Sequence, residues 1–146
     1  MPPPSASYGS GARAMAREDV EMVRRALEEW NRGARSETAI RAFWHPEVEF
    51  LPRRSATEGP YRGIDGLERF VADTDETFEK FEQHYEILDM GDRLLVWGSL
   101  HVRARGSGIE TDIPTGAILD FRDGKIVRWE DFGSKEKALE AVGMTE

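Results

Sequence analysis

The sequence predicts an α+β domain in which helices pack on one face of a curved antiparallel sheet. Two observations support this fold class. In the first half of the chain, apolar residues recur at helical spacing in three segments. In the second half, glycine-containing turns separate segments in which neighbouring residues point to opposite faces, as they do in strands. At 146 residues, the chain fits a single domain with a substantial core.

The first half is expected to contain three helices and one strand. The first helix covers residues 18–32, and the second covers residues 37–44 and stops before Pro46. A strand around Phe50 leads to a loop over residues 53–63. Asp65, with an acidic residue three positions later, resembles a capping box for the third helix. The expected buried face of that helix consists of Leu67, Phe70, Val71, Thr74 and Phe78.

The second half is expected to form an antiparallel meander. A strand around Tyr85 is followed by a long strand over residues 94–105 and a returning strand over residues 109–121. Asp123-Gly124 is a strong hairpin signal before the last strand. Ser134 is placed to cap a final short helix.

The composition argues against several classes of function. A formal net charge of −8 argues against nucleic acid as the main partner, because nucleic-acid affinity depends on clustered Lys and Arg. The absence of cysteine rules out disulfides and thiolate metal sites and fits a cytoplasmic location. No apolar run approaches the length that spans a bilayer, so no membrane partner is expected. Glu110 and Asp112 have no histidine at ligand spacing, and we expect neither a metal nor a cofactor.

The N-terminal residues 1–16, MPPPSASYGSGARAMA, lack the continuous apolar centre of a secretory signal. We expect them to form a flexible leader ahead of a single domain over residues 17–146. Met15 is an alternative start position.

Three stretches carry a resemblance to a known family: YRGIDGLERF (residues 61–70), PTGAILDFRDGKIVRW (residues 114–129) and KALEAVGM (residues 137–144). Together with the order of elements, they resemble the SnoaL-like branch of the nuclear transport factor 2-like superfamily. The resemblance implies a cone-shaped, antiparallel or mixed sheet that wraps around three N-terminal helices and leaves an interior pocket. It also implies a homodimer formed through the outer sheet face. The fold hosts isomerases, cyclases, epoxide hydrolases and non-catalytic binders, so it does not fix the function.

The catalytic residues of three relatives match this sequence to different degrees. The ketosteroid-isomerase positions fall on residues that cannot perform acid–base chemistry, namely Ala26, Leu51 and Ala117. The last strand of the limonene-epoxide-hydrolase type resembles residues 124–131, which gives Asp131 the position of a catalytic carboxylate. Its Arg-x-Asp partner falls on residues 99–101, which lack both charged residues. The catalytic Asp of the polyketide-cyclase type falls nearer Gly133 than Asp131.

Alternation provides an independent reason to single out the same strands. Trp129 and Asp131 share one face of the last strand. One face of the long strand is purely apolar, and the other carries Leu95, Trp97, Ser99, His101 and Arg103. We expect this mixed face to line the pocket, so that His101 and Asp131 meet there. The reverse assignment, with the mixed face in water, stays open.

These placements lead to a functional hypothesis. Asp131 takes or gives a proton, His101 assists, and Arg103, or Arg62 from the loop, stabilises a developing oxyanion. Ser99 and a set of aromatic residues are expected to contact the ligand, namely Trp97, Trp129, Tyr61, Trp30 and Trp44. The sequence thus favours a small-molecule-binding protein that acts on a hydrophobic metabolite as a cofactor-free hydrolase, isomerase or cyclase. The alternatives are a non-catalytic carrier or sensor, a dimerising assembly module, and a purely structural His101–Asp131 pair.

Overall fold

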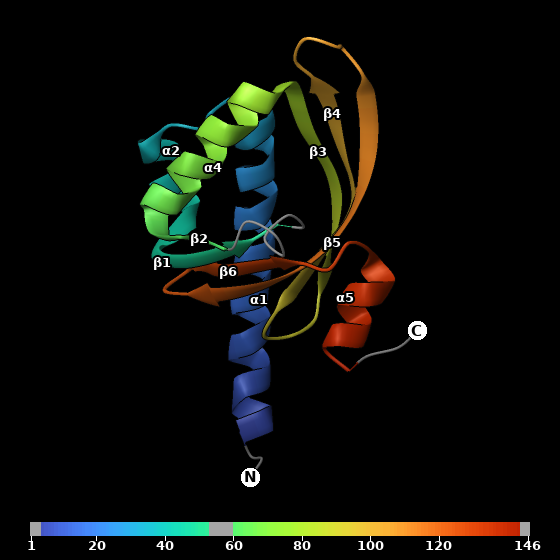
Figure 1. Ribbon diagram of the computed structural model, residues 1–146. Helices are drawn as coiled ribbons and strands as arrows, with labels where there is room; N and C mark the ends of the chain where they lie inside the picture. Colours follow the sequence, from blue (N-terminus) through green and yellow to red (C-terminus); the bar gives the residue numbers. More distant parts are fainter. Residues whose placement is uncertain (1–3, 53–59, 144–146) are drawn as a thin grey trace.

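The computed structural model describes residues 4–52 and 60–143, and within them it contains four helices and one six-stranded sheet (Figure 1). The helices are α1 (Pro4–Asn31), α2 (Glu37–Phe43), α4 (Gly63–Thr77) and α5 (Lys135–Ala141). The strands are β1 (Trp44–Leu51), β2 (Tyr61–Arg62), β3 (Phe78–Asp89), β4 (Leu94–Ala104), β5 (Glu110–Arg122) and β6 (Lys125–Asp131). The predicted α+β class is therefore confirmed.

The sheet is mixed, with the strand order β2-β1-β6-β5-β4-β3. Strands β3 to β6 form the predicted meander, because each consecutive pair among them is antiparallel. β1 joins the sheet by parallel pairing with β6. Figure 1 shows the sheet curving around α1, α2 and α4, while α5 lies on its other side. The curvature creates an inner face on the side of the three N-terminal helices.

Helix α1 is longer than the sequence predicts. Residues 4–16 continue the helix, and Figure 1 shows α1 extending well beyond the sheet. Residues 11–17 are rich in Ala, Arg and Met, which have high helix propensity, and an existing helix extends more readily than a new one begins. The structure thus places residues 4–16 in α1, where the sequence predicts a flexible leader, and residues 1–3 lie outside the described part of the chain.

Adjacent residues of β4 belong to two cores on opposite faces of the sheet. Leu94 and Val96 join the main core, which includes residues of α1, α2 and α4. Leu95 joins a smaller core with Ala138 and Leu139 of α5. The main core is rich in aromatic residues, and the rings of Phe50 and Phe70 meet edge to face with centroids 4.7 Å apart.

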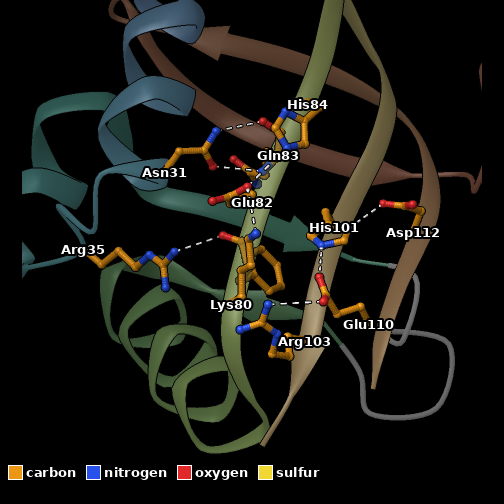
Figure 2. Close-up of polar contacts among 11 residues, drawn as sticks. Asn31, Arg35, Lys80, Glu82, Gln83, His84, His101, Arg103, Glu110 and Asp112 are labelled. Carbon is orange, nitrogen blue, oxygen red and sulfur yellow. Dashed lines mark hydrogen bonds and ion pairs between the residues drawn. The ribbon is translucent and has the colours of Figure 1, made fainter. Parts of the chain in front are cut away.

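The segment around the end of α1 covers the free edge of the sheet at β3 (Figure 2). Asn31 Nδ2 donates to the Gln83 carbonyl at 2.8 Å, and the Gln83 amide N–H donates to Asn31 Oδ1 at 2.9 Å. Arg35 Nη2 donates to the Phe81 carbonyl at 3.1 Å. These bonds satisfy main-chain groups at an edge strand and fix α1 relative to β3.

The predicted helix starts have different outcomes. Ser134 caps α5, since its Oγ accepts a hydrogen bond from the Lys137 amide at 3.1 Å. The capping box at Asp65 is wrong: α4 begins at Gly63, and the side chain of its N-cap residue makes no capping hydrogen bond. Phe78, predicted to lie on the helix, is the first residue of β3.

Candidate functional site

A mostly apolar cavity of about 280 Å³ lies on the inner side of the sheet. Its volume is close to the lower end of the ~300–1,000 Å³ range typical of small-molecule sites. Aromatic rings form much of its wall, and the polar residues are few. The lining residues are Phe50, Pro52, Phe70, Phe78, Phe81, Gln83, Tyr85, Leu100, Ile113, Thr115, Trp129 and Asp131. This composition suits a compact apolar ligand with a small number of polar groups.

Asp131 is the acidic residue among those that line the cavity. It is the last residue of β6, opposite Ala117 of β5. Its Oδ1 accepts hydrogen bonds from the amide N–H groups of Gly133, at 2.8 Å, and Gly116, at 3.3 Å. These donors orient the carboxylate and stabilise its negative charge. The chain thus places an oriented carboxylate in an aromatic wall.

Tyr85 and Thr115 form a second polar element of the cavity. The Tyr85 hydroxyl donates to Thr115 Oγ1 at 3.3 Å, and Thr115 is buried. Burial raises the pKa of Tyr85 far above its ordinary value; the hydrogen bond to Thr115 lowers the pKa in part, and the charge of Asp131 raises it further. Tyr85 therefore stays neutral at physiological pH. It acts as a hydrogen-bond donor that holds Thr115 rather than as a base.

His101 does not share this cavity with Asp131. It lies on the outer face of the sheet, where its Nδ1 is 2.8 Å from Asp112 Oδ1 and its Nε2 is 2.7 Å from Glu110 Oε1 (Figure 2). Arg103 Nη2 binds the other oxygen of Glu110 at 3.2 Å. The hydrogen bonds to Asp112 and Glu110 raise the pKa of His101 above its ordinary value, which desolvation only partly opposes. The expectation of a shared His101–Asp131 pocket is therefore wrong.

The face of β4 explains this correction. Leu100 lines the cavity, whereas His101, one residue later, points away from it. The purely apolar face of β4 is the inner one, as in the alternative that the sequence left open. A cavity wall of a small domain is also core, so apolar side chains occupy it. The mixed face instead pairs its charges across β4 and β5.

The other predicted contacts on β4 share the outer face with His101. Ser99 lies opposite Pro114 of β5, two residues along the strand from His101. Trp97 packs against the smaller core beneath α5, and Lys135 Nζ lies 4.6 Å from the centre of its ring. None of Trp97, Ser99 and Arg103 lines the cavity.

Of the remaining predicted contacts, Trp129 lies in the cavity wall and Tyr61 does not. The Tyr61 ring is 4% exposed and packs edge to face on Phe70, with centroids 5.4 Å apart. Its hydroxyl donates to Asp73 Oδ2 at 3.1 Å. Tyr61 is therefore a core residue that joins β2 to α4.

Trp30 and Trp44 line a second, smaller hollow of about 30 Å³, which we call the inner hollow. Its walls also include Val23, Ala26, Leu27, Ile40 and Leu67. The inner hollow and the cavity share four lining residues: Phe50, Phe70, Gln83 and Trp129. The two spaces are therefore neighbours that these side chains separate.

The sequence reasoning missed Gln83, Tyr85 and Thr115 as cavity residues. Gln83 and Tyr85 are two residues apart on β3, and Thr115 faces them from β5. The same alternation that assigned faces to β4 could have grouped them. Grouping residues of β3 with Thr115 of β5 also requires the register between the strands, which cannot be read from a local sequence pattern.

Within the described residues, no group of three or more histidine, aspartate or glutamate side chains is arranged to hold a metal ion. The helices of this part of the chain also include none that is long and apolar enough to cross a membrane.

A curved mixed sheet around three helices, with an aromatic cavity on its inner side, defines the nuclear transport factor 2-like class of α+β folds. Residues 23–129 match the SnoaL-like domain, and the chain belongs to that family. The family resemblance seen in the sequence is thus confirmed. Among curated proteins, none matches the chain.

Solved structures show the same fold. TerC, co-crystallised with polyporic acid, has 23% identity and a TM-score of 0.67, over 81% of this chain and 92% of TerC. A nuclear transport factor 2-like protein of unknown function from Burkholderia pseudomallei has 20% identity and a TM-score of 0.68, over 84% and 95% of the two chains. A proposed SnoaL-like polyketide cyclase from Jannaschia has 23% identity and a TM-score of 0.66, over 87% and 90%.

Proposed function

We propose that the protein binds a small hydrophobic molecule in the aromatic cavity and acts on it by cofactor-free acid–base catalysis, with Asp131 as the base. The observation that carries the proposal is an oriented carboxylate in an otherwise mostly apolar cavity. TerC, a protein of the same fold, was co-crystallised with polyporic acid, which agrees with a small-molecule ligand here. Of the reaction types expected from the sequence, isomerase and cyclase reactions fit best, because both can begin with removal of a proton next to a carbonyl group.

The chemistry uses groups that the cavity already holds. In the first step, a carboxylate oxygen of Asp131 takes a proton from the carbon next to the substrate carbonyl, and the electron pair moves onto the carbonyl oxygen as an enolate. Thr115, held by the neutral Tyr85 hydroxyl, is the candidate donor to that oxygen. The protonated Asp131 then returns the proton to another atom of the same substrate. His101 takes no part in these proton transfers, because it lies on the outer face of the sheet.

A direct test is the exchange of the C1 protons of 2-tetralone, a bicyclic ketone, in D2O. We expect the protein to accelerate the exchange, followed by proton NMR, and Asp131→Asn to reduce that acceleration roughly 10²- to 10⁴-fold. His101→Gln serves as the matched control and should exchange like the unaltered protein. Binding of 2-tetralone without any acceleration would leave a non-catalytic carrier as the function, and equal rates for the protein and Asp131→Asn would exclude Asp131 as the base.

We also propose that the protein acts in the cytoplasm as a homodimer that pairs through the outer sheet face. The absence of cysteine agrees with a reducing compartment. The purely apolar face of β4 lies in the main core, and Leu95 and Trp97 of the other face pack against α5. Neither supports the dimer, so its support is the family resemblance. Light scattering that gives a monomer mass at high protein concentration and low salt would exclude it.

A further inference from the structure

The indole nitrogen of Trp30 is an unused hydrogen-bond donor beside the proposed binding site. Trp30 Nε1 is buried and has no hydrogen-bond partner within the described part of the chain. A buried N–H without an acceptor costs about 1–3 kcal/mol, so such groups are uncommon and call for an explanation. This unpartnered donor belongs to Trp30, which lines the inner hollow.

The inner hollow borders the cavity. Its volume of about 30 Å³ is enough for one water molecule or the end of a ligand group. Gln83 lines both spaces, and its side-chain amide is a second polar group there beside the Trp30 N–H. Aromatic side chains account for the rest of the shared wall. These side chains separate the two spaces, so a ligand group must displace them to reach Trp30 from the Asp131 region.

The structure also holds Trp30 in place. Arg35 Nε donates to the Trp30 carbonyl at 3.2 Å, and the Arg35 guanidinium carbon lies 4.5 Å from the centre of the Trp30 ring. The next residue, Asn31, makes two hydrogen bonds with the main chain of Gln83 (Figure 2). Trp30 and Gln83 are thus fixed relative to each other from two sides. A preorganised donor contributes more to recognition than a mobile one, because less entropy is lost on binding.

We propose that Trp30 Nε1, together with the side-chain amide of Gln83, binds a hydrogen-bond acceptor at the end of the ligand opposite Asp131. The inference rests on the proposed function and specifies its substrate class. The ligand is an elongated aromatic or fused-ring compound with a carbonyl or ether oxygen at one end. Its other end carries the hydroxyl or the acidic C–H that faces Asp131.

The test compares two probes of nearly equal shape, 6-acetyl-2-naphthol and 6-isopropenyl-2-naphthol. They differ in one atom group, because the carbonyl oxygen of the first replaces the methylene of the second. We expect the ratio of their affinities, measured by calorimetry, to fall roughly three- to tenfold in Trp30→Phe, the size of one net hydrogen bond. The ratio cancels any general loss of packing in the variant. Trp97→Phe, on the outer face, is the control and should leave both affinities unchanged.

The outcomes separate this inference from the proposed function. If both probes bind and Trp30→Phe leaves the ratio unchanged, the acceptor site is wrong while the cavity remains a binding site. If neither probe binds, the proposed function fails and this inference with it. Should Trp30→Phe not fold, NMR of the unaltered protein decides: one of the four indole N–H signals must shift further with the acetyl probe than with the isopropenyl probe. Equal shifts would indicate that only an ordered water occupies the inner hollow.

Discussion

At the scale of single residues, the two members of the predicted catalytic pair have opposite environments. Asp131 is oriented by two main-chain N–H groups in the cavity wall. His101 lies between two carboxylates on the outer face. Both carry side chains that acid–base catalysis uses, so residue type alone cannot distinguish them. Only the face on which each residue lies separates the candidate base from a surface ion pair.

His101 gives a prediction about pH. Its pKa in the folded protein is raised above the ordinary value of 6.5, with the hydrogen bond to Asp112 as the largest cause. The folded state therefore binds the proton more tightly than the unfolded state, so the stabilisation is complete below pH 6.5 and is lost as pH rises through the raised pKa. The interaction with His101 lowers the pKa of Glu110, which keeps that carboxylate ionised in the same range.

We therefore expect His101→Gln to be less stable than the unaltered protein at pH 6, with a difference that shrinks towards pH 9. Urea unfolding at both pH values measures it. His84→Gln, on the neighbouring strand β3, is a control for removing an exposed histidine. A stability difference that is the same at both pH values would show that the charge of His101 contributes nothing.

At the scale of elements, the strand pair β3–β4 depends on a close approach of two main chains. Gly98 of β4 has φ +148°, and a Cβ at this position would lie 2.2 Å from the carbonyl oxygen of His84 on β3. Real Cβ atoms do not approach a main-chain oxygen so closely, so β3 would have to move. Because β3 also supplies Phe81, Gln83 and Tyr85 to the cavity, the cavity depends on this glycine.

We expect Gly98→Ala to lower the free energy of unfolding by about 2–4 kcal/mol, from backbone strain and from the steric contact together. Gly106→Ala is the matched control. Gly106 lies in the turn after β4 and also has a positive φ of +86°, but a Cβ added there would meet no other atom within 4 Å. It should show the cost of strain alone, about 1–2 kcal/mol. Equal losses of stability in the two variants, measured by denaturant unfolding, would contradict the role of the close approach.

At the scale of the whole molecule, the cavity is space that the core leaves unfilled. Empty apolar space costs packing energy, so a protein that keeps it without a function would gain by filling it. The cavity walls come from β1, α4, β3, β4, β5 and β6 and from Pro52, which means that most of the fold contributes to one site.

This leads to a prediction about stability and binding. We expect Ile113→Phe, which adds a ring inside the cavity, to raise the free energy of unfolding by about 1 kcal/mol. It should also weaken 2-naphthol binding by roughly tenfold or more, because the probe and the ring compete for the same space. The control is Ile109→Phe; Ile109 lies just before the same strand, is 64% exposed, and its replacement should change neither quantity. Thermal unfolding and calorimetry measure the two effects, and unchanged 2-naphthol affinity in Ile113→Phe would exclude this cavity as the site.

The sequence by itself determined the order and type of most elements, the meander of β3 to β6, the cap at Ser134 and the family. These features depend on local spacing, turn residues and hydrogen bonds between near neighbours, which a linear pattern contains. Alternation also determined that Trp129 and Asp131 share a face.

The tertiary structure alone decided which face of each strand turns inward. Rotating a strand by half a turn about its own axis exchanges its two faces without changing its alternation of residues. The face that turns inward therefore depends on packing against α1, α4 and α5, which are distant in sequence. That choice placed Leu100 in the cavity and His101 outside it. It also brought Tyr85, Thr115 and Asp131 together in the cavity wall. Trp30 lines the neighbouring inner hollow, which shares Trp129 and Gln83 with the cavity.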